Sequence, residues 1–148
     1  MKILDTPYGI CHLSVVPVRL APDEGAEMVT QLLFGELLQV LEKHNSWSYI
    51  RLLFDNTEGW VDNNQITEIS DKDYRKSLKK KDKYAHKWLT NLRLKTGDDL
   101  FLHIPKGATF SHNHLLHTSQ STQRPSNKGV VATALEYLNV PYLSGGKT

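Results

Sequence analysis

The sequence contains a single cysteine, Cys11, among its 148 residues. One cysteine excludes an intrachain disulfide and any zinc or iron–sulfur site built from several cysteines. A long apolar run is also missing, because the longest one falls far short of the roughly 20 residues that a membrane span needs. We therefore predict no membrane partner.

The N-terminus lacks the pattern of a signal peptide. A basic residue, Lys2, is present, but Asp5, Pro7 and Gly9 interrupt any apolar stretch of the roughly 7–15 residues that secretion requires. If Met1 is the true start, we expect a cytoplasmic protein.

Neither sign of charge dominates the composition. The sequence has 18 Lys and Arg residues against 16 Asp and Glu residues, a formal net charge of +2. This charge is too small to indicate a nucleic-acid partner. The length suits one ordinary domain or two small ones, and it is sufficient to bury about 70% of the surface that the unfolded chain exposes.

Residues 9–66 show short β-forming runs separated by turns, with no helical period. The run Met28–Phe34 is one example, and Asp55-Asn56 is one of the turn signals between runs. A spacing of about ten residues between such runs is typical of a small antiparallel barrel. We expect a mainly β protein in which residues 1–69 form a barrel of five or six strands.

Residues 70–83 form a basic stretch with a helical pattern. Ser70 can cap a helix, Asp73 completes a capping-box-like pattern, and Tyr74 and Leu78 lie one turn apart. Eight Lys or Arg residues and three Asp residues fall between positions 71 and 88. Such a run can bind phosphate or an acidic polymer. Because no base-reading motif accompanies it, we interpret it as the solvated face of a short connecting helix.

Residues 84–117 contain a second set of short, turn-bounded apolar blocks. Turn signals such as Pro105–Gly107 separate them, and Ala108–Phe110 is the last expected strand. We interpret this region as a second, abbreviated β block.

The final segment, residues 118–148, begins with a polar stretch. Residues 118–128 have the composition of a linker. A short helix is expected over residues 130–138, with Asn127 as its cap and Pro141 beyond its end.

Three histidines, His112, His114 and His117, are close enough in sequence to suggest a zinc or nickel site. Sites of that kind hold their ligands on rigid strands or helices, whereas this segment borders the polar linker. We interpret the three side chains as structural or exposed, and we predict neither a metal nor a cofactor.

Two further patterns are similar to a cysteine nucleophile and to a phosphate-binding loop, but neither meets the requirements of its site. Cys11 is followed by His12, yet adjacent residues on a strand point to opposite faces, so we expect an inert, buried or half-buried thiol. The ending Gly146–Thr148 is similar to the end of a phosphate loop, but Pro141 stands where that motif needs its first glycine. We assign no catalytic residue in this chain.

The first block resembles a bacterial SH3-like domain. The resemblance depends on the order and spacing of four pieces, which are Val18-Arg19, Gly35-Glu36, Ser46-Trp47 with Tyr49-Ile50-Arg51, and Glu58-Gly59-Trp60-Val61. It implies a small SH3-like antiparallel barrel to whose core the tryptophans contribute apolar area. The block over residues 84–117 is then a second, abbreviated SH3-like block.

The last block resembles the start of the catalytic domain of NlpC-type cysteine peptidases. In that family a helix leads through a Pro-Tyr-x-Trp-Gly-Gly stretch to an Asp-Cys-Ser-Gly nucleophile. Here Pro141-Tyr142 and Gly145-Gly146 match, while Ser144 stands where Trp is usual and the chain ends before the nucleophile. The resemblance implies a truncated peptidase domain that lacks its catalytic cysteine and histidine.

The two resemblances together imply the recognition portion of a murein-peptide endopeptidase. Such enzymes cleave the γ-D-glutamyl–diamino acid bond in L-Ala-γ-D-Glu-diamino acid peptides, and the SH3-like domain helps to recognise the substrate amine. The resemblance assigns substrate binding to Glu27, to Thr57 in place of a usual Tyr, and to Tyr142. Glu27 is equally well explained as a solvent-facing strand residue. The alternative function is a stand-alone SH3-like module that binds peptide or peptidoglycan.

Overall fold

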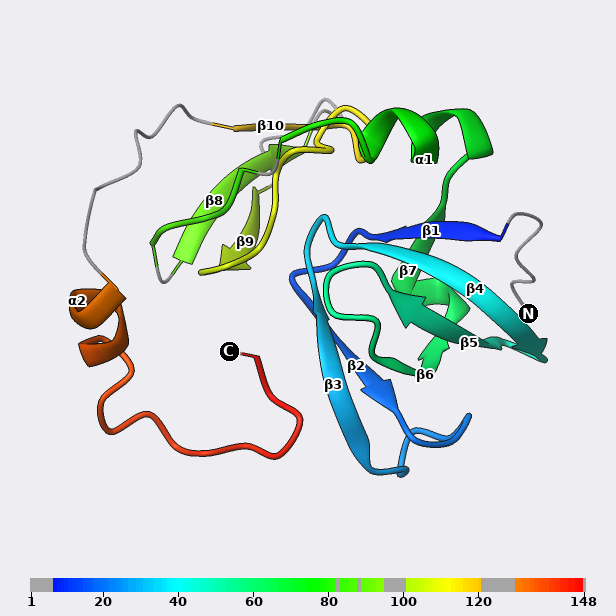
Figure 1. The fold of residues 1–148 in the computed structure, drawn as a ribbon, viewed down its shortest axis with the longest axis horizontal. Coiled ribbons are helices and arrows are strands. Elements are labelled where there is room, and N and C mark those ends of the chain that lie inside the picture. Colours follow the sequence, from blue (N-terminus) through cyan, green and yellow to red (C-terminus); the bar gives the residue numbers. More distant parts are fainter. Residues whose placement is uncertain (1–6, 82, 88, 95–100, 121–129, 148) are drawn as a thin grey trace.

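The computed structural model describes residues 7–81, 83–87, 89–94, 101–120 and 130–147. Its main feature is one antiparallel sheet of seven strands that curls into a small barrel (Figure 1). The strands are β1 (Tyr8–Cys11), β2 (Val15–Arg19), β3 (Met28–Leu33), β4 (Leu37–His44), β5 (Trp47–Leu52), β6 (Glu58–Asp62) and β7 (Ile66–Glu68), with a short 3-10 helix η1 (Asn63–Gln65) before β7. The mainly β class and the barrel are confirmed, and the prediction of five or six strands is wrong.

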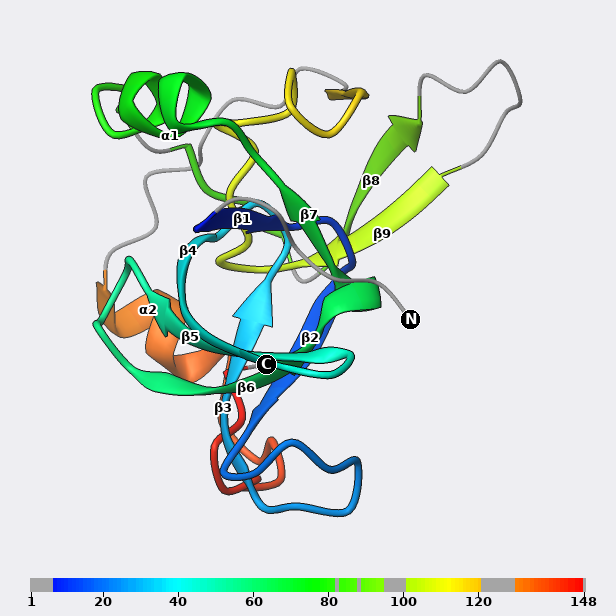
Figure 2. The same cartoon turned by 90° about the vertical axis from the view of Figure 1, so that its right-hand side faces the viewer.

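The strand order within the sheet is β3-β2-β6-β5-β4-β1-β7, so β3 and β7 are its edges. The pairs β2–β3, β4–β5 and β5–β6 are hairpins of successive strands. The other pairs, β1–β4, β1–β7 and β2–β6, join strands that are distant in sequence, and β2 meets β6 at the single register pair Arg19–Trp60. Figure 2 shows how the sheet rolls around its own core. Alternate side chains of each strand face that core, as the two-residue period of a strand requires.

The barrel core is apolar and closely packed. In β2, buried Val16 and Val18 alternate with half-buried neighbours, and in β5 the residues Ser48, Ile50 and Leu52 point inward. The buried cluster consists of Cys11, Val16, Val18, Leu32, Leu38, Val40, Ile50, Leu52, Val61 and Ile66. Burial of this kind stabilises a domain by about 1.5–3 kcal/mol for each large apolar side chain.

The two tryptophans of the barrel do not belong to this core. Trp47 and Trp60 are half-buried and lie on the opposite face of their strands. The expectation that they supply apolar area to the core is therefore wrong. The period of the strand gives the reason, because Val61 and Ser48, their neighbours in sequence, take the inward positions.

Helix α1 (Asp71–Ser77) follows the barrel and is shorter than the expected segment. The Ser70 hydroxyl accepts a hydrogen bond from the backbone N–H of Asp73, so the predicted cap is confirmed. Tyr74 stacks on Tyr8 of β1 with ring centroids 3.8 Å apart, which fixes the helix to the barrel. Leu78, expected on the same face as Tyr74, is largely exposed at 55%.

A second antiparallel sheet contains three strands in the order β10-β8-β9. They are β8 (Leu89–Leu94), β9 (Phe101–Pro105) and β10 (Thr118–Gln120). The third strand lies in the stretch expected to be linker, whose remainder at 121–128, including the expected cap Asn127, lies outside the described residues. At the expected strand over 108–110, the structure has only the isolated bridge between Thr109 and Tyr84.

The second sheet packs against the β3–β4 corner of the barrel. Phe34 and Leu33 share a buried cluster with Leu92 of β8 and Ile104 of β9. The Thr109 N–H donates a hydrogen bond of 3.0 Å to the Phe34 carbonyl, which adds a backbone link between the two parts. This packing places the Gly35-Glu36 turn at the junction between the barrel and the second block.

Helix α2 (Val130–Leu135) is followed by a turn and an extended tail. The helix is shorter than the expected 130–138, and the chain turns at Asn139, whose φ is 68°. An ion pair between Lys106 and Glu136 links this segment to the end of β9. In the part of the chain that the structure describes, no helix has the length and apolarity to cross a membrane.

Candidate functional site

The Gly35-Glu36 turn between β3 and β4 has a tightly determined backbone. Gly35 has a φ of 82°, and a Cβ at this position would lie 1.9 Å from the carbonyl oxygen of Thr109. Only glycine fits such a conformation beside such a neighbour. The Cys11 N–H donates to the Glu36 carbonyl, and the Gly35 N–H donates to the Cys11 carbonyl, so both residues are bonded to β1.

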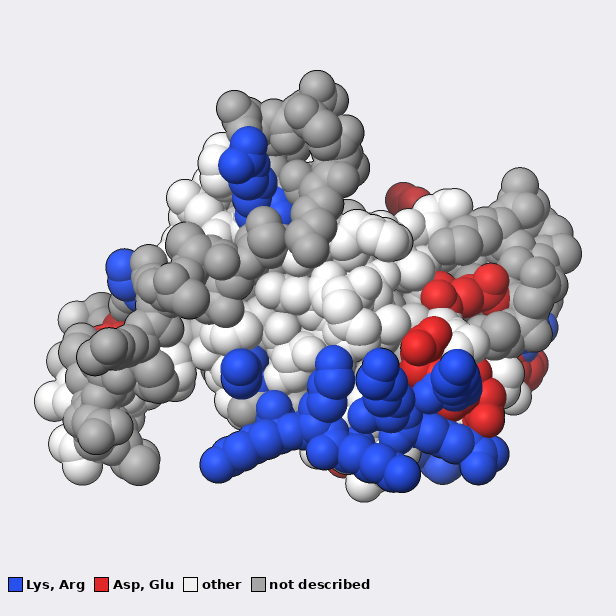
Figure 3. All heavy atoms as spheres, turned by 90° about the horizontal axis from the view of Figure 1, so that it is seen from above, with Lys and Arg blue, Asp and Glu red and all other residues white. Residues whose placement is uncertain are grey.

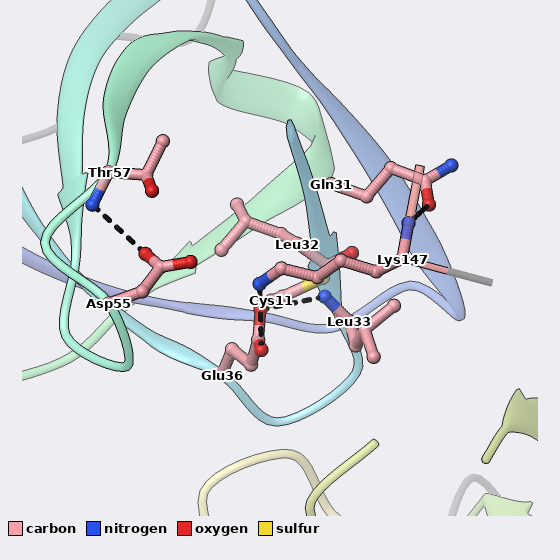
Figure 4. Close-up of polar contacts among 8 residues, drawn as sticks. All are labelled: Cys11, Gln31, Leu32, Leu33, Glu36, Asp55, Thr57 and Lys147. Atoms are coloured by element: carbon pink, nitrogen blue, oxygen red, sulfur yellow. Dashed lines mark hydrogen bonds and ion pairs between the residues drawn. The ribbon is translucent and has the colours of Figure 1, made fainter. Parts of the chain in front are cut away.

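The Glu36 side chain is held by the barrel and by the C-terminal tail. Its Oε2 accepts a hydrogen bond of 3.0 Å from the Leu33 N–H. Lys147 Nζ lies 3.1 Å from Oε1 and 3.2 Å from Oε2 (Figure 4). The Glu36 side chain is only 12% exposed and the Lys147 side chain only 18%. A carboxylate so placed is a strong acceptor for an ammonium group.

Two further contacts fix Lys147. Its backbone N–H donates a hydrogen bond of 2.7 Å to the Gln31 Oε1 of β3. Its Nζ lies 5.4 Å from the centroid of the Phe54 ring, within the range of a cation–π interaction. The Glu36 carboxylate and the Phe54 ring hold the Lys147 ammonium group, while Gln31 holds its backbone. We call these three residues the ammonium-binding corner.

The tail reaches this corner along the edge strand β3. Gly145 has a φ of 74°, and a Cβ there would lie 2.5 Å from the Met28 carbonyl oxygen and 2.9 Å from that of Val29. The tail can therefore lie this close to β3 only because residue 145 is glycine. The first glycine of the Gly-Gly stretch is therefore required by its packing against β3.

The residues predicted to bind substrate lie on three separate segments of the described chain. Glu27 is exposed and directly precedes Met28, beside which Gly145 lies. Thr57 is half-buried in the β5–β6 loop, the loop that also carries Phe54, and its N–H donates to Asp55 Oδ1 at 2.9 Å. Tyr142 is 91% exposed. None of the contacts described here joins two of these three side chains.

Reasoning from sequence missed the residues of the ammonium-binding corner. From the sequence, Glu36 belongs to a turn of the SH3-like block, and Lys147 belongs to a rejected phosphate-loop ending and to the peptidase-like stretch, so neither is expected to take part in a site. The signal available in the sequence was the negative charge of Glu36 in one motif and the positive charge of Lys147 in another. The fold brings these two residues together although they are 111 positions apart.

Cys11, the only thiol, is buried in the barrel core as expected. Its Sγ donates to the Leu13 carbonyl at 3.3 Å. Burial is the main cause that raises the pKa of this thiol to about 12. A cysteine nucleophile needs a lowered pKa and access to substrate, so Cys11 is not suited to that role.

The outer face of β5 and β6 carries a half-buried polar and aromatic group. The Trp60 ring lies 5.3 Å from that of Tyr49 and 6.2 Å from that of His44. The Tyr49 hydroxyl donates to Glu58, which also pairs with Arg51 at 2.5 Å. The hydrogen bond from Arg51 lowers the pKa of the Glu58 carboxyl, while desolvation and then the bond to Glu58 raise the pKa of Tyr49.

The three neighbouring histidines do not converge. His112 is buried at 3% exposure, and Lys80 Nζ lies 3.2 Å from His114 Nδ1. Burial and the positive charge of Lys80 lower the pKa of His114. Within the described residues, no group of three or more His, Cys, Asp or Glu side chains is placed to hold a metal ion.

Comparison with known proteins shows what the barrel is similar to. Residues 18–66 match the sequence model of the bacterial dipeptidyl-peptidase SH3 domain. No curated protein matches the chain.

Among solved structures, the chain is similar to an NlpC/P60 family protein from Bacillus cereus ATCC 10987. The TM-score is 0.57 at 13% sequence identity, over 69% of this chain and 46% of the other. This chain therefore spans less than half the length of that protein, and the similarity shows a common fold. Residues 18–66 are therefore similar to the bacterial dipeptidyl-peptidase SH3 domain, and the chain shares the fold of part of an NlpC/P60 family protein.

Proposed function

We propose that this chain is the substrate-recognition portion of a cell-wall peptide cysteine endopeptidase that cleaves γ-D-Glu–diamino acid bonds. The observation that carries the proposal is the docking of residues 145–147 on β3 and Glu36. In the peptidases that the tail resembles, this stretch leads to the nucleophile. An SH3 barrel that binds this stretch would fix the start of the segment that carries the catalytic cysteine in such an enzyme.

The chemistry of cleavage would come from residues that this chain does not contain. Cys11 is buried with a raised pKa. A cysteine peptidase also needs a base and oxyanion donors next to its thiolate, and no cofactor. In this proposal the chain supplies binding and positioning, and the protein acts in the cytoplasm on recycled murein peptides.

Substrate recognition is proposed for Glu27, Thr57 and Tyr142. Glu27 directly precedes β3, Thr57 lies in the β5–β6 loop and Tyr142 lies in the tail. Met28 of β3 and Phe54 of that loop lie beside residues 145 and 147 of the tail. An exposed carboxylate such as Glu27 can bind the free ammonium group of an N-terminal L-Ala. An exposed ring such as Tyr142 can cover the apolar part of a peptide.

Calorimetric titration with L-Ala-γ-D-Glu-diaminopimelate tests this assignment. Glu27→Gln is expected to weaken binding by about 10–150-fold, the loss of about 1.5–3 kcal/mol for a hydrogen bond to a charged group. Glu24→Gln, which alters an exposed carboxylate in the preceding loop, is the matched control and should bind like the wild type.

The N-acetylated tripeptide provides the second comparison, because it has no ammonium group. It should bind weakly to the wild type and lose nothing further on Glu27→Gln. Equal losses for both peptides would show that Glu27 acts on stability and not on recognition of the amine.

The alternative is a stand-alone module that binds peptide or peptidoglycan. The outer-face group of half-buried Tyr49 and Trp60 with exposed His44 favours it, because aromatic residues are enriched in binding surfaces. Binding to intact peptidoglycan that Trp60→Ala abolishes, without binding of the tripeptide, would select this alternative.

A further inference from the structure

The eight Lys and Arg residues between positions 72 and 87 form a band on the surface, which we call the basic band. All eight are exposed, and Figure 3 shows Lys and Arg side chains gathered along one edge of the molecule, with acidic side chains beside only part of this edge. Residues 71–88 carry a formal net charge of +5, so the rest of the chain carries −3. The positive charge of the chain is therefore concentrated on this band.

Most of the positive charge in the basic band has no acidic partner. Arg75 pairs with Asp71 at 2.8 Å, and Lys80 Nζ lies 3.2 Å from Nδ1 of His114. Among the described residues, the side chains of Lys76, Lys79 and Lys81 form neither a hydrogen bond nor an ion pair. These three ammonium groups are available to an anionic partner, and their summed field attracts one.

The backbone beneath the basic band is fixed to the rest of the chain. Tyr74 of α1 stacks on Tyr8 of β1. Beyond the helix, the Lys83 N–H donates 2.6 Å to the Ser111 hydroxyl, and the Lys83 carbonyl accepts 3.0 Å from the Phe110 N–H. The band is thus a surface that folding has already assembled. A partner would have to order only the lysine side chains and not the backbone.

The extent and composition of the basic band favour a long phosphate-bearing partner. Helix α1 alone is about 10 Å long, and the band continues beyond it to Lys87. One small anion cannot contact charges spread over such a length. Seven of the eight members are Lys and one is Arg. An ammonium group binds phosphate as a point charge, whereas a planar carboxylate is matched best by the fork of Arg.

Two other anionic partners fit the basic band less well. A helix that lies on a membrane turns an apolar face towards the lipid, whereas Tyr74 and buried Ser77 of α1 face the protein and leave Leu78 as an isolated exposed apolar side chain. Single-stranded nucleic acids are held by several rings on which successive bases stack. Tyr84 is the only exposed Phe, Tyr or Trp among the described residues of 71–87.

We infer that the basic band binds a linear phosphate polymer that carries no bases. Lys76, Lys79 and Lys81 each contact a phosphate group, and binding releases the cations that are condensed around the polymer. The band is then more than the solvated face of a connecting helix. This inference goes beyond the proposed recognition of a peptide and does not depend on it.

Fluorescence anisotropy with end-labelled inorganic polyphosphate tests the inference. The affinity should fall by about 100-fold between 50 and 200 mM salt, the dependence of about five phosphate contacts on a flexible polyanion. Lys79→Gln should weaken binding by about 5-fold, and the triple variant Lys76→Gln, Lys79→Gln, Lys81→Gln by about 100-fold. Lys43→Gln removes the same charge from an exposed position on β4 outside the band, and it should bind within about 2-fold of the wild type.

Tripolyphosphate is the ligand control, because it has the same chemistry but cannot span the band. Equal losses from Lys43→Gln and Lys79→Gln, or competition by tripolyphosphate that is as strong per phosphate as that of the polymer, would overturn the inference. Binding as tight to poly-L-glutamate, to oligothymidylate of matched charge or to phosphatidylglycerol vesicles would also overturn it, because the partner would then be a carboxylate polymer, a nucleic acid or a membrane. Matching amide spectra of the unliganded variants establish that each one is folded.

Discussion

At the scale of the residue, Cys11 links burial to the pH dependence of stability. The pKa of the folded thiol is raised from 9.0 to about 12, chiefly by desolvation. Below pH 9 both states keep the proton, so this contribution is fully present. As the pH rises from 9 towards 12, the unfolded chain loses the proton and the folded chain keeps it. The free energy of unfolding should then fall by up to about 1.4 kcal/mol per pH unit from this group.

Urea unfolding at pH 8, 9, 10 and 11 measures the effect. The other titrating groups contribute equally to the pH dependence of unfolding in the wild type and in the Cys11→Ala variant. The difference in slope between the two proteins therefore isolates the thiol. Parallel pH profiles would contradict the prediction, as would rapid alkylation of the folded protein by iodoacetamide.

At the scale of the element, the β5–β6 hairpin has two faces with different energetics. Trp60 on the outer face is half-buried against Tyr49, while Ile50 on the inner face is fully buried. We expect Trp60→Ala to destabilise the protein by about 1–2 kcal/mol, because only part of its apolar area leaves water. Ile50→Ala, the control on the other face, should cost about 2–5 kcal/mol. Chemical denaturation measures both, and equal costs would place Trp60 in the core.

Elements with a local signal were predictable from the sequence. The Ser70 cap starts α1 where expected, because a side-chain hydroxyl and the Asp73 N–H are local partners. Strands β7 and β10 were missed. Both have three residues, and the polar Thr118–Gln120 forms a strand only because β8 offers it a backbone partner. Such pairing leaves no pattern in a segment's own side chains.

At the scale of the whole molecule, the pair of Glu36 and Lys147 fastens the tail to the barrel. A double-mutant cycle of Glu36→Gln and Lys147→Met, read from amide exchange at residue 147, should give a coupling of about 1 kcal/mol. The exposed pair Asp71–Arg75 on α1 is the matched control, and its coupling in unfolding should be about 0.3–0.5 kcal/mol. Wild-type exchange at residue 147 as fast as in a free peptide would show that the tail is undocked.

The candidate site was less predictable than the fold because it depends on contacts between residues that are far apart in the sequence. Exposed Glu27 and Tyr142 were suggested by resemblance to a family. The corner at Glu36 depends on a contact between the first and the last segments of the chain. No periodicity or spacing in the sequence indicates a contact between residues so far apart, whereas a barrel strand can be predicted from the alternation of a few neighbouring residues.

The position of the tail also affects association between copies. Strand β3 is an edge of the seven-stranded sheet, and an uncovered edge presents backbone groups that can pair with another chain. Gly145 lies against the carbonyls of Met28 and Val29, and Lys147 bonds to Gln31 of the same strand. The tail thereby shields the edge from a neighbouring molecule. Release of the tail would leave β3 open to intermolecular strand pairing and aggregation.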